Sequence, residues 1–425
     1  MHIKEDFLHY IWKHKKFDTQ NLRTDTGLPI RVLKAGQANL DAGSDFFNSL
    51  IEIGQQKWAG NVEIHVRASD WYAHHHETDS GYDNVILHVV WENDAQVFRK
   101  DHSTVPTLEL RDVVPVELIS RYAELINNPK QFINCEKDFA GVDELVKLHW
   151  LERLYFERLE RKTLDITSLL NRSGQDWEAV LYILLFKYFG SKVNGVSFEY
   201  LAKGLDFSIV RKNRNDLQSL EALFFGQAGL LEVDCEDNYF LTLKESYNYL
   251  AHKHQLQPNL SAKPHFFRLR PPNFPTIRLS QLAKLFSSRV HLFDNILEAK
   301  TIEDYYQLFR FATSEYWNSH YTFGKISKNS KKTLSKNFVD LLVINVVVPL
   351  RFAYLQSIGK TENDFLLKLI QSIEPEHNSI TQNFDLLQKI NANALISQSL
   401  IQLKNEYCTP NKCLKCEIGS HLLKK

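Results

Sequence analysis

WAGNVEIHVRASDWYAHHH, residues 58–76, is the stretch that decides how the first part of this chain folds. Successive residues of a β-strand point to opposite faces, so Glu63 and His65 share one face of a strand here. The valine and isoleucine residues that alternate with them share the other face. The pattern predicts a strand with hydrophobic core on one side and polar, chemically active side chains on the other.

Strand patterns surround this stretch on both sides. Four runs have the composition of strands: LPIRVLKAG at 28–36, NSLIEIG at 48–54, KWAGNVEIHV at 57–66 and NVILHVVW at 84–91. The second and third runs flank a short turn, which predicts a β-hairpin, and the fourth is apolar enough to be a buried strand. A short helix is expected before them, over residues 3–15.

The pattern changes near residue 116, where apolar residues begin to recur every three or four positions. This spacing is typical of amphipathic helices and continues through most of the remaining sequence. The run QPNLSAKPHFFRLRPPNFP at 257–275 predicts an irregular segment. We therefore expect an α+β protein with a mixed α/β domain at residues 1–115, a helical domain at 116–256 and a second helical domain at 257–425.

The composition is that of a folded, globular protein. A chain of 425 residues is longer than one hydrophobic core usually serves, and its formal net charge is zero, so nucleic-acid binding would need a local basic patch. Apolar runs stay well below about 18 residues and the first residues carry charges, so we expect neither a membrane span nor a signal peptide. The five cysteines suit a reducing compartment, and the expected location is the cytoplasm. The oligomeric state stays open.

Two carboxylates of the predicted hairpin suggest a metal site. Asp45 lies just before its first strand and Glu63 lies in its second, so a short hairpin could place them side by side. Such an oxygen-rich pair suits Mg²⁺ or Mn²⁺, which can activate water and neutralise charge on a phosphate. His65, on the same face as Glu63, could orient or deprotonate that water. The alternative is that Asp45 caps a turn while Glu63 and His65 face solvent.

Histidines that follow the hairpin are supporting candidates. His88 lies inside an apolar run, where an unpaired imidazole would be costly to bury, so we expect it to have a partner. That partner is either a carbonyl or carboxylate, or a metal or the Glu63 cluster. His74 and His76 with Asp79 could alternatively form a zinc or manganese site, because imidazole is a preferred ligand of these ions. A histidine-rich loop without function is also common.

Three cysteines near residue 410 have the spacing C-x4-C-x2-C: Cys408, Cys413 and Cys416. Three thiolates need a fourth ligand to complete a tetrahedral zinc site or an iron–sulfur cluster. His421 is close in sequence, while Cys135 or Cys235 could arrive from elsewhere. A metal here would be structural rather than catalytic. The alternative is three ordinary thiols in a helical turn.

A basic, aromatic segment is the best local candidate for nucleic-acid binding. Residues 263–292 contain no Asp or Glu, and Arg268, Arg270 and Arg278 alternate there with phenylalanines. Arginine contacts phosphates and aromatic rings stack on bases, so DNA or RNA is the expected partner. The alternative is that these arginines fasten an extended loop to neighbouring helices and that the phenylalanines belong to the core.

The arrangement of Asp45, Glu63 and His65 resembles the PD-(D/E)xK nuclease superfamily, whose core carries an Asp at the start of one strand and Glu-x-Lys in the next. Asp45 would match the Asp of the motif, Glu63 its acidic residue and His65 its lysine. Ser44 stands where the motif has proline, and histidine replaces lysine. The resemblance implies a restriction-endonuclease-like α/β domain, and Glu5 of the first helix is a further candidate because an acidic residue there often accompanies such sites.

The chain as a whole resembles the bacterial domain-of-unknown-function family 2851. Five blocks carry this resemblance: AGSDFFNSLIEIG, WAGNVEIHVRASDWYAHHHETDSGYDNVILHVVWEND, RPPNFPTIRLSQLA, INVVVPLRFAYL and SQSLIQLKNEYCTPNKCLKCEIG. The resemblance runs from about residue 5 onward and implies no particular activity.

The leading hypothesis is a metal-dependent nuclease or phosphodiesterase that acts on nucleic acid. Asp45 and Glu63 would be its metal ligands, and His65 would position the attacking water. One alternative is a non-catalytic module that binds nucleic acid or protein and contains a structural metal site. Another is a zinc hydrolase built on His74, His76 and Asp79. Whether the protein is an enzyme is left open by the sequence.

Overall fold

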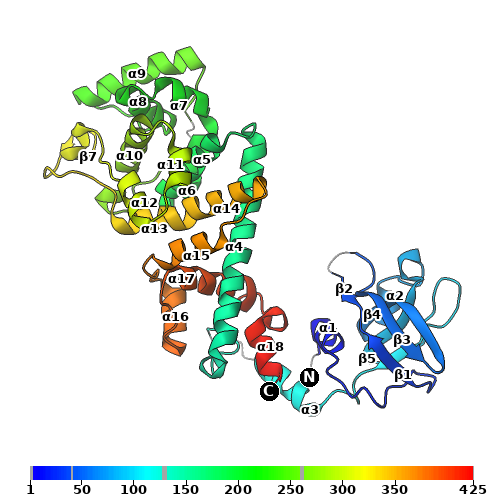
Figure 1. Ribbon diagram of the computed structural model, residues 1–425. Helices are drawn as coiled ribbons and strands as arrows, with labels where there is room; N and C mark the ends of the chain where they lie inside the picture. The colour runs from blue at the N-terminus through cyan, green and yellow to red at the C-terminus, as the bar shows by residue number, and fades with distance from the viewer. Residues whose placement is uncertain (1–2, 40–41, 127–131, 259–262, 425) are drawn as a thin grey trace. The chain divides into compact units, whose positions relative to one another are not determined.

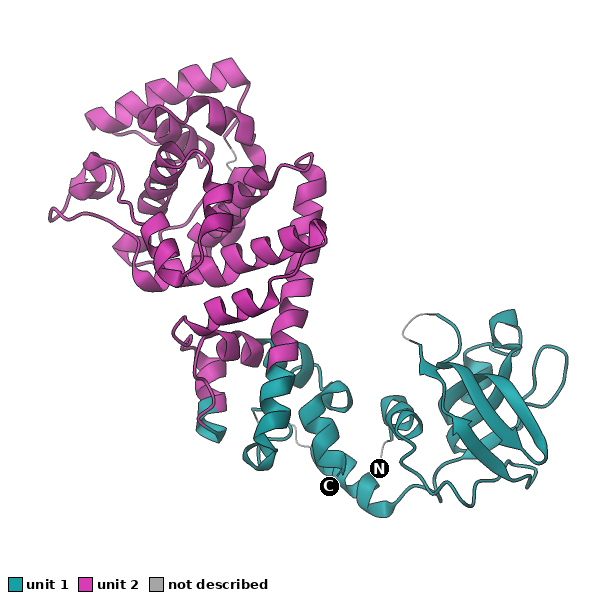
Figure 2. Ribbon diagram, in the orientation of Figure 1, with its two compact units in different colours: residues 1–151, 385–388, 402–425 teal, residues 152–384, 389–401 magenta. Residues whose placement is uncertain are grey.

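The computed structural model describes residues 3–39, 42–126, 132–258 and 263–424. The chain forms two compact units (Figure 2). Unit 1 comprises residues 1–151, 385–388 and 402–425, and unit 2 comprises residues 152–384 and 389–401. These bounds group the chain differently from the division at residues 115 and 256, which stays a prediction.

A six-stranded mixed sheet forms the first half of unit 1 (Figure 1). Its strands are β1 (Ile30–Lys34), β2 (Gln37–Ala38), β3 (Phe46–Ile53), β4 (Gln56–Arg67), β5 (Val85–Glu92) and β6 (Thr107–Glu109). The order is β1-β3-β4-β5-β6, with β2 paired to β3. β3 and β4 are the predicted antiparallel hairpin, whereas β4, β5 and β6 are parallel. The connection from β4 to β5 contains the short helix α2 (Asp70–Ala73).

Both faces of this sheet are covered. On one face, Val62 and Ile64 of β4 join a core that includes α1 (Glu5–Lys13) and α3 (Val116–Ile126). On the other face, Trp71 of α2 packs with Val90 of β5 in a smaller cluster. Glu63 and His65 point to this second side, where they are only 4% and 1% exposed. The alternative in which they face solvent is therefore wrong.

Helices make up most of the remaining chain, which confirms the expected α+β class. The long helix α4 (Glu144–Arg172) begins in unit 1 and continues in unit 2, and α18 (Glu417–Lys424) belongs to unit 1. The other helices are α5 (Trp177–Phe189), α6 (Ser191–Gly204), α7 (Phe207–Asn213), α8 (Leu217–Gln227), α9 (Asn238–His254), α10 (Pro275–Ser288), α11 (Leu292–Glu298), α12 (Ile302–Leu308), α13 (Lys336–Leu342), α14 (Val348–Ser357), α15 (Asn363–Gln371), α16 (Ser379–Leu387) and α17 (Ala394–Gln402). A small hairpin, β7 (His320–Thr322) and β8 (Lys325–Ile326), lies in unit 2.

One helical stretch within the described residues is long and apolar enough to cross a membrane by length and composition. It runs from Lys336 to Ser357, through α13, a π-helical turn at Val343–Val347 and α14. Inside the fold, 83% of its most apolar window is buried. A core helix that is mostly buried inside a fold passes the same test of length and composition, and the cytoplasmic location stays a prediction.

Candidate metal centre

Asp45 and Glu63 lie side by side where β3 begins, as the hairpin predicts. The backbone N–H of Asp45 donates to Glu63 Oε2 at 3.1 Å, and the backbone N–H of Ile64 donates to Asp45 Oδ2 at 2.9 Å. Each carboxylate therefore binds backbone of the other strand. The remaining oxygen of Glu63, Oε1, points toward a group of imidazoles.

Two histidines approach this oxygen, and a third adjoins one of them. The Nε2 atoms of His76 and His65 lie 3.5 Å and 3.8 Å from Glu63 Oε1, and His65 Nε2 lies 3.1 Å from His74 Nδ1. One ligand atom from each of the three histidines lies within 4.8 Å of the other two. We call Glu63, His65, His74 and His76 the histidine–glutamate cluster.

The loop after α2 brings two of these histidines to β4. α2 ends at Ala73, and His75 takes up a left-handed conformation (φ 59°) that turns its own side chain to solvent. His74 stays exposed on one side of this turn, while His76 is 8% exposed on the other. The ring of His76 stacks on Tyr82 with ring centroids 3.7 Å apart, which fixes its orientation.

His88 finds the partner that its burial requires. It lies opposite Glu63 on β5 and is completely buried. Its Nε2 lies 2.8 Å from His65 Nδ1, so the two rings share one hydrogen bond. A histidine that binds a metal commonly uses its second ring nitrogen in this way, which fixes its tautomer and orientation. His88 is therefore placed to orient His65.

Burial controls the protonation of the cluster. It lowers the pKa of His65 to about 4 and lowers the pKa of His88 well below its ordinary value. Both rings are therefore neutral at neutral pH, which is the form that binds metals. Burial also raises the pKa of Glu63, against the opposing effect of His76.

A second group of potential ligands adjoins the cluster at Asp45. His9 Nε2, from α1, lies 3.3 Å from Asp45 Oδ2 and 3.7 Å from Glu5 Oε1. Burial alone would lower the pKa of His9, but hydrogen bonds to Asp45 and Glu5 outweigh it and raise the pKa to about 9. His9 is absent from the sequence-based candidates. The signal that could have found it is its position four residues after Glu5, on the same face of a helix.

Asp79 lies outside the histidine–glutamate cluster. It is exposed and caps the short 3-10 helix Ser80–Tyr82, where its Oδ1 accepts from the backbone N–H of Gly81 at 2.8 Å. An aspartate that caps a turn is committed to local backbone. Glu63 and His65, rather than Asp79, are the residues that join His74 and His76.

The three arginines proposed for nucleic acid have different surroundings in unit 2. Arg268 and Arg270 are exposed in the irregular segment before α10. Arg278 is buried, with its guanidinium 3.7 Å from the ring centroid of Phe338, and it donates hydrogen bonds to Gln281 and Asn273. Arg268 and Arg270 are thus accessible to a nucleic acid, whereas the Arg278 side chain is buried and contacts Phe338, Gln281 and Asn273.

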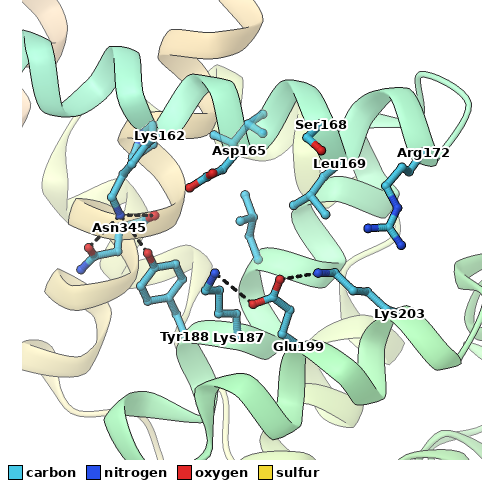
Figure 3. A pocket seen from close by; sticks show the side chains of 13 residues that line it. Lys162, Asp165, Ser168, Leu169, Arg172, Lys187, Tyr188, Glu199, Lys203 and Asn345 are labelled. Atoms are coloured by element: carbon cyan, nitrogen blue, oxygen red, sulfur yellow. Dashed lines mark hydrogen bonds and ion pairs between the residues drawn. The ribbon is translucent and has the colours of Figure 1, made fainter. Parts of the chain in front are cut away.

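Unit 2 also contains a cavity of about 230 Å³ among α4, α5 and α6 (Figure 3). Burial lowers the pKa of Lys162 strongly, and its Nζ lies 2.8 Å from the hydroxyl of Tyr188. Glu199 forms ion pairs with Lys187 at 2.9 Å and with Lys203 at 2.5 Å. Because these polar side chains pair with one another, we assign the candidate site to unit 1, where ligand atoms converge.

Acid is expected to destabilise the metal-free protein. Because burial lowers the pKa of His65 from 6.5 to about 4, the unfolded chain binds this proton at a higher pH than the folded chain does. The contribution of His65 to the free energy of unfolding should therefore be largest above pH 6.5 and fall by on the order of 3 kcal/mol as the pH drops toward 4.

Urea unfolding in the presence of a chelator, at several pH values between 7 and 4, measures this effect. His65→Gln should flatten the dependence on pH, whereas His75→Gln should retain it because the His75 side chain is exposed. Equal slopes in wild type and His65→Gln would contradict a buried, neutral His65.

Comparison with known proteins identifies a family. A family model described as "Protein of unknown function (DUF2851)" matches residues 5–379. No curated protein and no solved structure matches the chain. The matched range includes the hairpin, the histidine–glutamate cluster and most of the helical region. Since it covers well over half of the sequence, this protein belongs to the DUF2851 family.

Proposed function

We propose that unit 1 is a metal-dependent phosphodiesterase whose substrate is nucleic acid. The observation that carries the proposal is the grouping of ligand atoms from His65, His74 and His76 within 4.8 Å of one another, with Glu63 Oε1 beside two of them. Three nitrogen ligands and a carboxylate favour Mn²⁺ or Zn²⁺ over Mg²⁺, which prefers oxygen ligands throughout.

The side chains present fit a metal in two respects. His76 Nε2 is buried, and the polar atom beside it is Glu63 Oε1 at 3.5 Å, so a metal ion could bind both atoms. His74, in contrast, is exposed, which leaves one side of the cluster open to water and substrate. Catalytic metal sites combine fixed protein ligands with such an open position.

A bound divalent ion would lower the pKa of a water molecule and neutralise charge on the phosphate. The residues of this chain supply the remaining requirements. His88 holds the ring of His65 through their shared hydrogen bond, which orients His65 toward the other ligand atoms. Asp45 places a second carboxylate beside Glu63, and His9 holds Asp45 from the side of α1.

Nucleic acid is proposed as the substrate class on two grounds. The positions of Asp45, Glu63 and His65 on adjacent strands are similar to the pattern of PD-(D/E)xK nucleases, with His65 in the place of lysine. Separately, in unit 2, Arg268 and Arg270 are exposed, as contacts to a phosphate backbone require. Hydrolysis of a phosphodiester bond is the reaction that a metal in unit 1 would catalyse on such a substrate.

Cleavage of labelled single- and double-stranded DNA and RNA by the full chain tests the proposal. The protein is treated with a chelator and then supplied with Mn²⁺, Zn²⁺ or Mg²⁺. We expect cleavage with Mn²⁺ or Zn²⁺, little with Mg²⁺ and none with chelator alone. Metal binding without cleavage of any substrate would instead favour a non-catalytic binding module with a structural metal site.

A matched pair of neighbouring histidines tests the ligand set. His74→Ala should weaken binding of Mn²⁺ or Zn²⁺ by about 100-fold or more, because it removes a direct ligand and even indirect partners contribute 10- to 100-fold. His75→Ala should leave affinity unchanged, since His75 points to solvent one residue away. Competition with a chelating dye measures both affinities. Equal affinities in the two variants would remove His74 from the ligand set.

A further inference from the structure

Four of the five cysteines gather in unit 1, although one of them is far from the others in sequence. Cys408 ends a π-helical turn (Leu403–Cys408), Cys413 begins a 3-10 helix (Cys413–Lys415) and Cys416 precedes α18. Cys135 lies in the turns after α3, and it packs against the same hydrophobic core that contains Cys413. All four are free thiols.

Direct contacts hold the segment around Cys135 against the C-terminal cysteines. Asn134 donates through Nδ2 to Asn411 Oδ1 at 3.2 Å and to Cys413 Sγ at 3.5 Å. Lys404 Nζ donates to the backbone carbonyl of Phe132 at 2.8 Å. A donor directed at the sulfur of Cys413 is the type of contact that stabilises a metal-bound thiolate.

The thiols also lie close enough to affect one another electrostatically. Burial is the main cause that raises the pKa of Cys135 and Cys408, and in both cases the charges of the other clustered thiols raise it further. Burial likewise raises the pKa of Cys416 to about 11. These mutual effects place the four thiols near one another.

We propose that Cys135, Cys408, Cys413 and Cys416 together bind a cubane iron–sulfur cluster. Among the described residues, no three of these four sulfurs lie within 4.8 Å of one another. A single zinc ion with Zn–S bonds of about 2.3 Å would hold them closer, at about 3.8 Å. A cubane separates its four thiolates by its own iron and sulfide atoms.

This assignment identifies the fourth ligand that the sequence left open. Cys235 belongs to unit 2, where its sulfur lies beside Gly324. Cys135 shares unit 1 with the other three thiols and is joined to them through Asn134. The iron–sulfur cluster would join residues 132–139 to residues 404–416 and take no part in hydrolysis. This inference therefore does not rest on the proposed function.

The test begins with the full-length wild-type protein, purified without oxygen. We expect about four irons and about four acid-labile sulfides per chain, with a broad visible absorption. Zinc without sulfide, or no metal beyond what the histidine–glutamate cluster binds, would overturn the proposal. Acid-labile sulfide separates the two sites, because only the cubane contains it. His74→Ala should therefore leave the sulfide content unchanged.

Two cysteine variants test the ligand assignment. Cys135→Ala should lose most of its iron and sulfide, whereas Cys235→Ala should retain both. Should Cys135→Ala prove insoluble, Cys135→Ser keeps a weaker oxygen ligand, and its Mössbauer spectrum should show one altered iron. Wild-type iron and sulfide content in a folded Cys135 variant would overturn the role of Cys135.

Discussion

Replacing Glu63 with glutamine is expected to lower metal-dependent cleavage of nucleic acid by about a thousandfold or more. Glu63 is the only anionic member of the histidine–glutamate cluster, and its Oε1 is the atom on which His65 and His76 converge. Loss of charge stabilisation at a metal costs several kcal/mol, and each 1.36 kcal/mol corresponds to a tenfold change in rate. The amide keeps an oxygen that can still accept from the Asp45 backbone, so the hairpin should fold normally.

A matched control is available on the neighbouring strand. Glu52 lies in β3, opposite Lys57, and outside the cluster. Glu52→Gln should leave cleavage within about twofold of wild type. Metal content and circular dichroism of both variants separate a lost ligand from a lost fold. If Glu63→Gln keeps a tenth or more of the wild-type activity, Glu63 does not bind the catalytic metal.

Gly226→Ala is expected to reduce the free energy of unfolding of unit 2 by about 1–2 kcal/mol. A methyl group at Gly226 of α8 would lie 2.2 Å from ring atoms of Tyr247 in α9. That ring is buried and its hydroxyl accepts from Gln227 at 3.0 Å, so it is not free to move aside. Overpacking of this kind costs about 1–3 kcal/mol or more, which outweighs the gain of up to about 1 kcal/mol from placing alanine in a helix.

Gly204→Ala serves as the control for this prediction. Gly204 ends α6, and a methyl group there would meet no atom within 4 Å. The substitution should leave stability unchanged or raise it by less than about 1 kcal/mol. Guanidinium unfolding followed by circular dichroism compares the two variants with wild type. Similar midpoints for Gly226→Ala and Gly204→Ala would mean that α8 and α9 pack less tightly than the structure indicates.

The elements of unit 1 follow from local patterns in the sequence. Alternation around Glu63 and His65 predicts β4, and the turn before it predicts the hairpin with β3. A period of two residues also assigns Glu63 and His65 to one face without any tertiary information. Placement of Asp45 at the start of β3 then follows, because antiparallel pairing brings that position beside Glu63.

Contacts between distant segments could not be read from the sequence in the same way. His9 meets Asp45 because α1 packs on the sheet, and no local pattern reports that packing. Arginine is a common contact for phosphates, but Arg278 of α10 is buried in the interior. His74 and His76 join Glu63 rather than Asp79 because the turn after α2 determines which side chains point inward.

Unit 1 is built from segments that are far apart in sequence, so its parts are synthesised at different times. Residues 1–151 leave the ribosome first, but residues 402–425 follow only after the rest of the chain has been translated. At about 5–20 residues per second, this gap lasts roughly 10 to 50 s. During that interval the apolar surface that Cys413 and Leu423 later cover stays open to water. A nascent chain should therefore bind chaperones through residues 1–151, and it should be released from them when residues 402–425 emerge.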